Sequence, residues 1–275
     1  MLTLCGVHPI FFINMNHNVK KLYQELIGMK DYSDYQKTNR LLESLFAFVL
    51  DKKGKNVLTN NEIVNLHKVI SQSVYEFEKY WANTIIKSKN PRKAFESFSD
   101  MDRYRKLTKM EWMSLLICSS HKKHNILFIG GGPLPITAIL IAQNHGQKVT
   151  VIDADAFACD ISRRLVKKLG LSKKIIIIQS DALGFQNYRQ FNVIFLASLV
   201  GIEKNMKENI LLHMRKHLQS KTHILVRSTF GKRKILYPPL PRRAYDIFNP
   251  ILEARILNGT INSVIIFEHS AKQGG

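Results

Sequence analysis

Cysteine is scarce in this chain of 275 residues, and Cys5, Cys118 and Cys159 lie far apart with no Cys-x-x-Cys pair. This spacing excludes a disulfide framework and a cysteine-rich zinc site, and it favours a reducing compartment. Long apolar runs are also missing, since Pro9–Ile13 is too short to span a bilayer and has no basic segment before it. We therefore expect a soluble, cytoplasmic protein with no membrane partner.

The ten histidines show no recurring metal-ligand spacing, so we predict no protein-bound metal. Lys and Arg exceed Asp and Glu by 41 to 21, and the resulting charge of +20 raises the question of an anionic partner such as RNA. The basic residues occur as scattered short pairs, without an arginine-rich arm or interleaved aromatic residues. This pattern favours a solvated basic surface over nucleic-acid binding.

The pattern of the chain changes near residue 120. Residues 1–15 are expected to be disordered or to precede the true start at Met15. Residues 16–120 are predicted to form a helical domain, and residues 121–275 an α/β domain. No internal repeat or low-complexity segment is present.

The clearest helix of the first domain begins at Thr59, which forms a predicted capping box with Glu62. Apolar residues then recur every three or four positions: Ile63, Leu66, Ile70, Val74, Phe77, Trp81 and Ile85. The helix is expected to end near Asn90, because a residue before proline disfavours helical geometry. A second helical stretch is predicted from about Pro91 through Leu116.

Strands and helices alternate from Asn125 onward. The predicted strands are 125–129, 148–153, 174–179, 192–199 and 223–227, and the predicted helices are 134–145, 156–169 and 203–218. The segments 251–257 and 261–267 flank Asn258-Gly259 and predict an antiparallel hairpin at the sheet edge. A doubly wound parallel sheet that closes with such a hairpin is typical of a class I methyltransferase-like Rossmann fold, preceded here by a helical bundle.

The segment Asn125–Thr137 is the most informative in the chain, because an apolar run stops at Gly130, Gly131 and Gly132 and a helix follows at once. Glycines there permit positive φ and let main-chain N–H groups approach a ligand, while the helix supplies the positive end of its dipole. A tight turn between a strand and a helix can use glycines for packing alone. We expect a cofactor loop that also includes Pro133, Leu134 and Thr137.

Two carboxylates follow strand ends in the same region. Asp153 ends the second strand, 21 residues after Gly132, where a carboxylate can accept hydrogen bonds from both ribose hydroxyls. Asp181 ends the third strand, where methyltransferase-like folds bind the adenine amino group, although a helix cap is an alternative role. With Ala182 and Ala197 beside them, these residues favour S-adenosylmethionine over a pyrophosphate cofactor.

The turn after the fourth strand narrows the reaction. Many enzymes that methylate nucleobase or amide nitrogens carry Asn- or Asp-Pro-Pro-Tyr there, whereas this chain reads Phe195-Leu-Ala-Ser-Leu-Val-Gly201. Tyr237-Pro-Pro239 follows the fifth strand and lacks the amide or acid. The sequence therefore argues against that class of methylation, but not against methyl transfer in general.

Three motifs in order carry a specific resemblance: Ile129–Thr137, Phe195–Gly201 and Arg227–Pro238. Together they resemble nicotianamine synthase and its bacterial opine-metallophore relatives, from roughly the Thr59 helix to the C-terminal hairpin. The resemblance implies transfer of the aminobutyrate arm of S-adenosylmethionine, rather than its methyl group, to an amine, with release of methylthioadenosine. The acceptor would be an amino acid or another S-adenosylmethionine, and the product a metallophore.

The resemblance implies Glu78 and Tyr104 as catalytic residues. Glu78 lies beside Val74 and Trp81 at the edge of the apolar face of the long helix, where partial burial would raise its pKa toward that of a useful general base. The residues alone favour a boundary glutamate in a surface ion pair for Glu78 and an ordinary packing residue for Tyr104, and the resemblance reverses that preference.

Arg227, Arg233 and Tyr237 follow the fifth strand at the expected rim, where guanidinium groups would bind substrate carboxylates. Arg233 could also be surface charge only. Two alternatives stay open: a small-molecule or RNA methyltransferase on the same fold, and an RNA-binding protein. A homodimer is a further expectation, and the identity of the small-molecule acceptor stays open.

Overall fold

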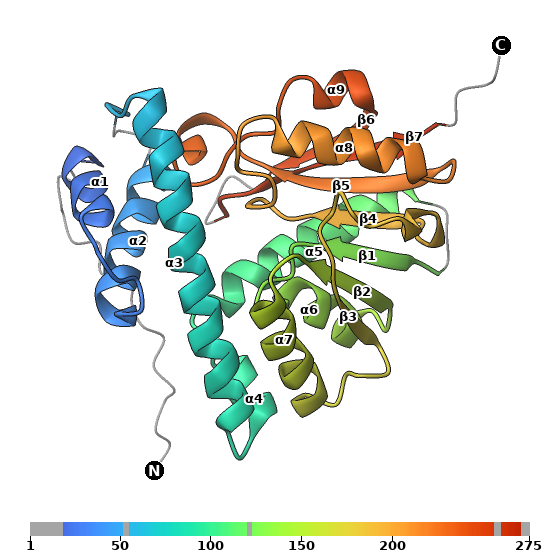
Figure 1. The fold of residues 1–275 in the computed structure, drawn as a ribbon, viewed down its shortest axis with the longest axis horizontal. Helices are drawn as coiled ribbons and strands as arrows, with labels where there is room; N and C mark the ends of the chain where they lie inside the picture. The colour runs from blue at the N-terminus through green and yellow to red at the C-terminus, as the bar shows by residue number, and fades with distance from the viewer. Residues whose placement is uncertain (1–18, 52–54, 120–122, 256–259, 271–275) are drawn as a thin grey trace.

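Seven strands form one sheet in the order β3-β2-β1-β4-β5-β7-β6 (Figure 1). The computed structural model describes residues 19–51, 55–119, 123–255 and 260–270. The strands are β1 Asn125–Ile129, β2 Lys148–Asp153, β3 Ile175–Gln179, β4 Val193–Leu196, β5 Thr222–Ser228, β6 Asn249–Arg255 and β7 Ser263–His269. β1 to β5 are parallel, and β7 pairs antiparallel with both β5 and β6. The predicted class I methyltransferase-like fold is confirmed.

The order of strands reverses between β1 and β4, and in open α/β sheets ligands bind at the carboxyl ends of the strands near such a point. Side chains alternate across the sheet, so that Phe128 packs on one face and Leu127 on the other. The Phe128 face is covered by α5 (Met101–Cys118), α6 (Ile136–Asn144) and α7 (Ala156–Lys168). The Leu127 face is covered by η1 (Asn187–Gln190), α8 (Met206–His217) and α9 (Ala244–Ile247).

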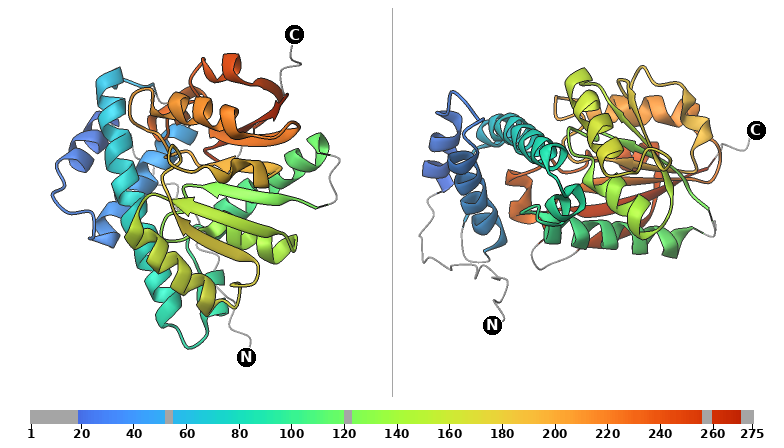
Figure 2. Two further views of the ribbon diagram at one scale, coloured as in Figure 1. Left: turned by 45° about the vertical axis from the view of Figure 1, so that its right-hand side comes forward. Right: turned by 90° about the horizontal axis from the view of Figure 1, so that it is seen from below.

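The remaining helices stand beside the sheet. They are α1 Val19–Ile27, α2 Tyr35–Leu50, α3 Asn60–Lys87 and α4 Pro91–Glu96. The end of α3 and α4 also add Ala82, Ile85 and Phe95 to the core on the Phe128 face. Figures 1 and 2 show the long α3 between the sheet and the outer pair α1 and α2. A separate apolar core joins α1, α2 and α3 to the segment η2 (Gly231–Ile235) through residues such as Leu66, Ile235 and Leu236. The predicted capping box at Thr59 and Glu62 is present.

Two predicted elements differ from the structure. The helical stretch predicted from Pro91 through Leu116 is two helices, because the chain turns between α4 and α5 and buries Phe98 against Phe77, Trp81 and Tyr104. The predicted fourth strand ends at Leu196 instead of residue 199, and a turn follows it. The hairpin turn Asn258-Gly259 and residues 1–15 lie outside the described residues, as does the predicted division near residue 120.

A buried ion pair joins the helical part to the sheet. Glu111 on α5 is fully buried and accepts from Arg227 on β5 at 2.6 Å from Nε and 3.0 Å from Nη2. Arg227 Nη2 also donates to the hydroxyl of Thr137 on α6 at 2.6 Å. Three elements therefore meet at one guanidinium group, and loss of Glu111 or Arg227 would leave the charge of the other buried and uncompensated.

We expect Glu111→Gln to lower the free energy of unfolding by about 3–5 kcal/mol, because it leaves the buried Arg227 charge without its counter-ion. Urea denaturation followed by circular dichroism measures this loss. Lys109→Gln removes a charge from the exposed side of the same helix and should change stability by no more than about 0.5 kcal/mol. Equal effects of the two substitutions would contradict a structural role for the ion pair.

Candidate functional site

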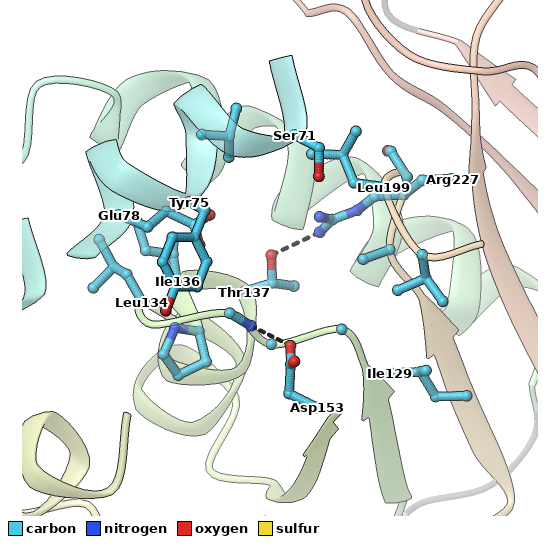
Figure 3. A pocket seen from close by; sticks show the side chains of 18 of the residues that line it. Ser71, Tyr75, Glu78, Ile129, Leu134, Ile136, Thr137, Asp153, Leu199 and Arg227 are labelled. Atoms are coloured by element: carbon cyan, nitrogen blue, oxygen red, sulfur yellow. Dashed lines mark hydrogen bonds between the residues drawn. The ribbon is translucent and has the colours of Figure 1, made fainter. Parts of the chain in front are cut away.

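A cavity of about 460 Å³ lies between α3 and α5 on one side and the carboxyl ends of β1, β2, β4 and β5 on the other. Most of the residues singled out in the sequence line it: Glu78, Tyr104, Gly130, Gly131, Gly132, Pro133, Leu134, Thr137, Asp153, Asp181, Ala182, Ala197, Arg227 and Tyr237. Figure 3 shows several of them around the pocket. Only Arg233 of the predicted set is not among the lining residues.

The glycine loop is built by close packing as much as by backbone conformation. Gly130 and Gly132 have φ of 84° and 60°, whereas Gly131 does not have positive φ, contrary to the expectation for all three. A Cβ on Gly131 would lie 2.2 Å from Cγ1 of Val151, so this position requires glycine for space. A Cβ on Gly132 would lie 2.4 Å from Oε2 of Glu78. The loop is thus shaped to receive the Glu78 carboxylate at its surface.

Asp153 at the end of β2 holds the glycine loop in place through hydrogen bonds. Its Oδ2 accepts from the N–H of Gly132 at 2.8 Å, drawn as a dashed line in Figure 3, and its Oδ1 accepts from the N–H of Asp155 at 3.0 Å. Each carboxylate oxygen can accept a further hydrogen bond, so the predicted ribose contact is compatible with these bonds. Asp181 accepts from the N–H of Leu183 at 2.6 Å through its Oδ1. One of its oxygens therefore has the capping role that the sequence offered as an alternative.

Glu78 projects from α3 into the cavity, on the same side of the helix as Ser71 and Tyr75 (Figure 3). It is half-buried by surface area because its carboxylate faces the cavity. Burial, and then the nearby Asp153 carboxylate, raise the pKa of Glu78 to about 8, against a smaller lowering by the Tyr104 hydrogen bond. The direction agrees with the expectation from the helix pattern.

Tyr104 on α5 donates its hydroxyl to Oε1 of Glu78 at 3.4 Å. Burial raises the pKa of Tyr104 well above its usual value, with Glu78 adding to the effect, and burial raises the pKa of Tyr237 to about 12. Both phenols therefore stay protonated near neutral pH. The cavity holds a weakly acidic carboxyl group with two phenolic hydroxyls beside it.

Arg227 was expected at the rim of the site, and the structure places it at the buried end instead, with 8% of its surface exposed. The reason is its ion pair with Glu111, which draws the guanidinium group under α6. Its Nε and Nη2 are used by Glu111 and Thr137, whereas its Nη1 has no acceptor within the described part of the chain. One edge of the guanidinium group is thus left for a ligand in the cavity.

Arg233 lies away from the cavity. Its Nε donates to the carbonyl of Thr260 at 3.1 Å, and its guanidinium group stacks on Phe230 at 4.5 Å from the ring centroid.

Arg103 lines the cavity, although nothing in the sequence had indicated it. Its Nη2 donates to Glu43 and Asp100 at 2.6 Å each, and the group lies over Phe46 at 4.3 Å from the ring centroid.

Other lining residues were also missed: Asn39, Ser71, Tyr75, Asp100, Thr260 and Asn262. Tyr75 and Ser71 lie one and two turns before Glu78 on α3, so helical periodicity around Glu78 would have found them. Asn39 on α2 and Asn262 before β7 come from distant segments, and no local pattern marks them.

Among the described residues, no group of three His, Cys, Asp or Glu side chains could hold a metal ion. The helices described here include none that is long and apolar enough to cross a membrane.

The fold and the cavity define a class of protein: a methyltransferase-like Rossmann sheet whose cofactor end is covered by helices. Comparison with known proteins gives the family. Residues 14–273 match the family model "Nicotianamine synthase protein". Nicotianamine synthase 1 of Arabidopsis thaliana is 28% identical over 267 residues, which cover 92% of this chain and 82% of the relative.

Solved structures agree in fold. The crystal structure of MtNAS in complex with MTA and tNA has a TM-score of 0.81 at 23% identity, covering 92% of this chain and 97% of the other. A mutant of MtNAS in complex with S-adenosylmethionine gives a TM-score of 0.79 at 21% identity with the same coverage.

This chain belongs to the nicotianamine synthase family. It is an S-adenosylmethionine-dependent aminocarboxypropyl transferase, as the three motifs of the sequence indicated.

Two glycines of similar conformation offer a test of the contact between Glu78 and the loop. Gly132 and Gly146 have φ of 60° and 67°, but a Cβ on Gly146 would meet nothing within 4 Å. Alanine at either position adds about 1–2 kcal/mol of backbone strain. Only Gly132→Ala also displaces the Glu78 carboxylate. We expect both variants to fold and Gly132→Ala alone to lose at least about tenfold in turnover, measured as release of methylthioadenosine. Equal turnover of the two variants would show that this position of Glu78 is not required.

Proposed function

We propose that Glu78 is the general base of the transfer and that Tyr104 orients it. The observation that carries this proposal is the seating of a desolvated carboxyl group against Gly132, within reach of the Tyr104 hydroxyl. A carboxylate with an ordinary pKa near 4.5 is a poor base for an amine. A Glu78 pKa of about 8 lies close to the value of about 8 for an α-amino group in peptides.

The acceptor amine attacks the γ-carbon of the aminobutyrate arm once its proton has passed to Glu78. A nitrogen–carbon bond forms, the bond between that carbon and sulfur breaks, and its electron pair stays on sulfur. The positive sulfonium thereby becomes the neutral thioether of methylthioadenosine. The cover that α3 and α5 form over the strand ends supports this chemistry, because it limits the bulk water that would compete with the amine and solvate Glu78.

The donor is proposed to bind along the carboxyl ends of β1 to β4. The glycine loop would approach the arm next to sulfur, Asp153 the ribose hydroxyls and Asp181 the adenine amino group, with Pro133, Leu134, Thr137, Ala182 and Ala197 around them. The acidic residues Asp100, Asp153 and Asp181 line the cavity beside two arginines that already have carboxylate partners, which favours a cationic sulfonium ligand. The S-adenosylmethionine bound by the MtNAS mutant supports this assignment.

The acceptor is proposed to be a small molecule with an amino group and a carboxylate. Asp100 would attract its ammonium group, and Arg103 and Tyr237 supply donors for a carboxylate, whereas the remaining edge of Arg227 is left for the other substrate, S-adenosylmethionine. Arg233 is left out of this set because its guanidinium group is occupied away from the cavity. Homodimer formation and a cytoplasmic location stay predictions.

Glu78→Gln tests the base directly. The amide keeps the shape and a hydrogen bond to Tyr104 but cannot accept the amine proton, so release of methylthioadenosine should fall by roughly 10²–10⁴ while S-adenosylmethionine still binds. Product analysis by mass spectrometry and calorimetric binding measure the two effects. Glu76→Gln is the matched control, because Glu76 pairs with Lys79 on the same helix and does not line the cavity. Wild-type turnover in Glu78→Gln would place the base elsewhere, and S-adenosylhomocysteine as product would indicate methyl transfer.

The pH profile of kcat/KM gives an independent test. Glu78 must be deprotonated to act as a base, so kcat/KM should rise with pH through an apparent pKa of about 8 in the free enzyme. Tyr104→Phe removes a hydrogen bond that lowers the pKa of Glu78, so its profile should move to higher pH as well as fall in height. The measurement is kcat/KM between about pH 6 and pH 10 for the unmodified protein and for Tyr104→Phe. A profile of Tyr104→Phe that falls in height without moving would mean that Tyr104 does not act through Glu78.

A further inference from the structure

Lys207 is a buried cation that the chemistry described so far does not use. Its exposed fraction is 3%, and its Nζ donates to the carbonyl of Ser198 at 2.8 Å, with no further acceptor among the described residues. It lies in the first turn of α8, where the helix dipole also disfavours a positive charge. Burial lowers the pKa of Lys207 to about 8, so the side chain is still largely protonated at neutral pH. The fold therefore retains a cation at a position that is unfavourable for one.

The partner of Lys207 is part of the cavity wall. Ser198 and Leu199 line the cavity, whereas Lys207 does not. The peptide bonds described are all trans, so the carbonyl of Ser198 and the N–H of Leu199 point in opposite directions. The carbonyl points away from the cavity to Lys207, and the N–H of Leu199 therefore points toward the cavity. This N–H has no acceptor in the described part of the chain.

Further contacts fix this peptide. The N–H of Val200 donates to the carbonyl of Ala197 at 3.3 Å, and Nδ2 of Asn262 donates to Oγ of Ser198 at 2.6 Å. Gly201 has φ of 66° and lies so close to Lys207 that a Cβ there would be 2.8 Å from the main-chain nitrogen of Lys207. The turn between β4 and α8 thus packs directly onto Lys207, the residue that binds the Ser198 carbonyl of this turn.

Leu199 lies on the same side of the pocket as Arg227 in the view of Figure 3. Nη1 of Arg227 is also without an acceptor among the described residues. Val200 and Ala197 touch the glycine loop at Gly130, where the donor is proposed to bind. A carboxylate is the ligand group that fits a main-chain N–H and a guanidinium edge together. In S-adenosylmethionine the only carboxylate is at the end of the aminobutyrate arm.

We propose that Lys207 is a positioning residue for a donor-carboxylate subsite, in which it holds and polarises the Ser198–Leu199 peptide so that the Leu199 N–H binds the carboxylate of S-adenosylmethionine. A cation on the carbonyl withdraws electron density from the peptide and strengthens its N–H as a donor. The inference rests on the proposed function, because it needs the donor in this cavity.

The test compares three ligands in the Glu78→Gln protein, which should not consume the donor during calorimetry. The ligands are S-adenosylmethionine, its decarboxylated analogue, which lacks only the carboxylate, and methylthioadenosine, which lacks the whole arm. The variants Lys207→Met and Lys207→Arg are added to that protein, with Lys204→Met as the control for loss of an exposed charge on the same loop.

We expect Lys207→Met to weaken S-adenosylmethionine roughly tenfold, since a hydrogen bond to a charged group is weakened, and to leave the other two ligands unchanged. Lys204→Met should change none of them, and Lys207→Arg should retain part of the affinity. Equal weakening of all three ligands would show a purely structural role and overturn the proposal. Unchanged affinity for S-adenosylmethionine, or a change only in the KM of the acceptor in active enzyme, would overturn it too.

Two outcomes separate this proposal from the proposed function. If none of the three ligands binds to the Glu78→Gln parent, the donor site itself is wrong. If Lys207→Met does not fold, the Glu78→Gln parent alone still tests the proposal. The subsite requires this parent to bind S-adenosylmethionine at least roughly tenfold more tightly than the decarboxylated analogue. Equal affinity of the parent for these two ligands would overturn the subsite while leaving the donor site intact.

Discussion

The buried pair of Glu111 and Arg227 is the interaction on which the geometry of the site depends. Taking both charges out of water costs several kcal/mol for each ion, and two hydrogen bonds between them together with the Thr137 hydroxyl offset that cost. The pair fixes α5 against β5 and α6. Tyr104 lies two turns before Glu111 on α5, so the same contact determines where its hydroxyl meets Glu78 on α3. The stability of the fold and the orientation of the proposed base thus depend on the same contact.

Charge is distributed unevenly between the surface and the cavity. The chain carries a net charge of +20, yet its cavity is lined by four acidic residues and by two arginines that are already paired with carboxylates. Asp153 and Asp181 suit a sulfonium ligand. Glu78 resists ionisation chiefly because it is buried, and the nearby Asp153 carboxylate adds to this effect. A bound sulfonium would stabilise the ionised Glu78 and lower its pKa. The base would therefore become ionised more readily once the donor is in place.

Most of the fold could be predicted from the sequence because its signals are local. The glycine loop, the apolar strands and the capping box at Thr59 each depend on neighbouring residues, and the structure confirms them. The break between α4 and α5 could not be predicted, because it depends on Phe98 packing against Phe77 on another helix. Tertiary contacts of this kind override helix propensity.

In the site, too, features with a local signal could be predicted and features that depend on tertiary contacts could not. The spacing of apolar residues predicts that Glu78 lies at the edge of an apolar helix face, and burial at that position raises its pKa. Arg227 was expected at the rim because its partner Glu111 lies 116 residues away in the chain, and no spacing rule connects them. Arg103 and Lys207 carry no local signal either, since their importance lies in the carboxylates and the carbonyl that they meet after folding.

The arrangement also accounts for the source of the base on this fold. In the enzymes that carry Asn- or Asp-Pro-Pro-Tyr, residues after the fourth strand handle the nucleophile. Here the corresponding turn, Ala197–Gly201, is held by Lys207 and Asn262 and offers main-chain groups to the cavity in place of an acid or amide side chain. The base proposed above comes from the opposite wall, which α3 and α5 form. If Glu78 takes the proton of the acceptor, the helical cover is part of the chemistry, because it brings this carboxyl group to the donor end of the sheet.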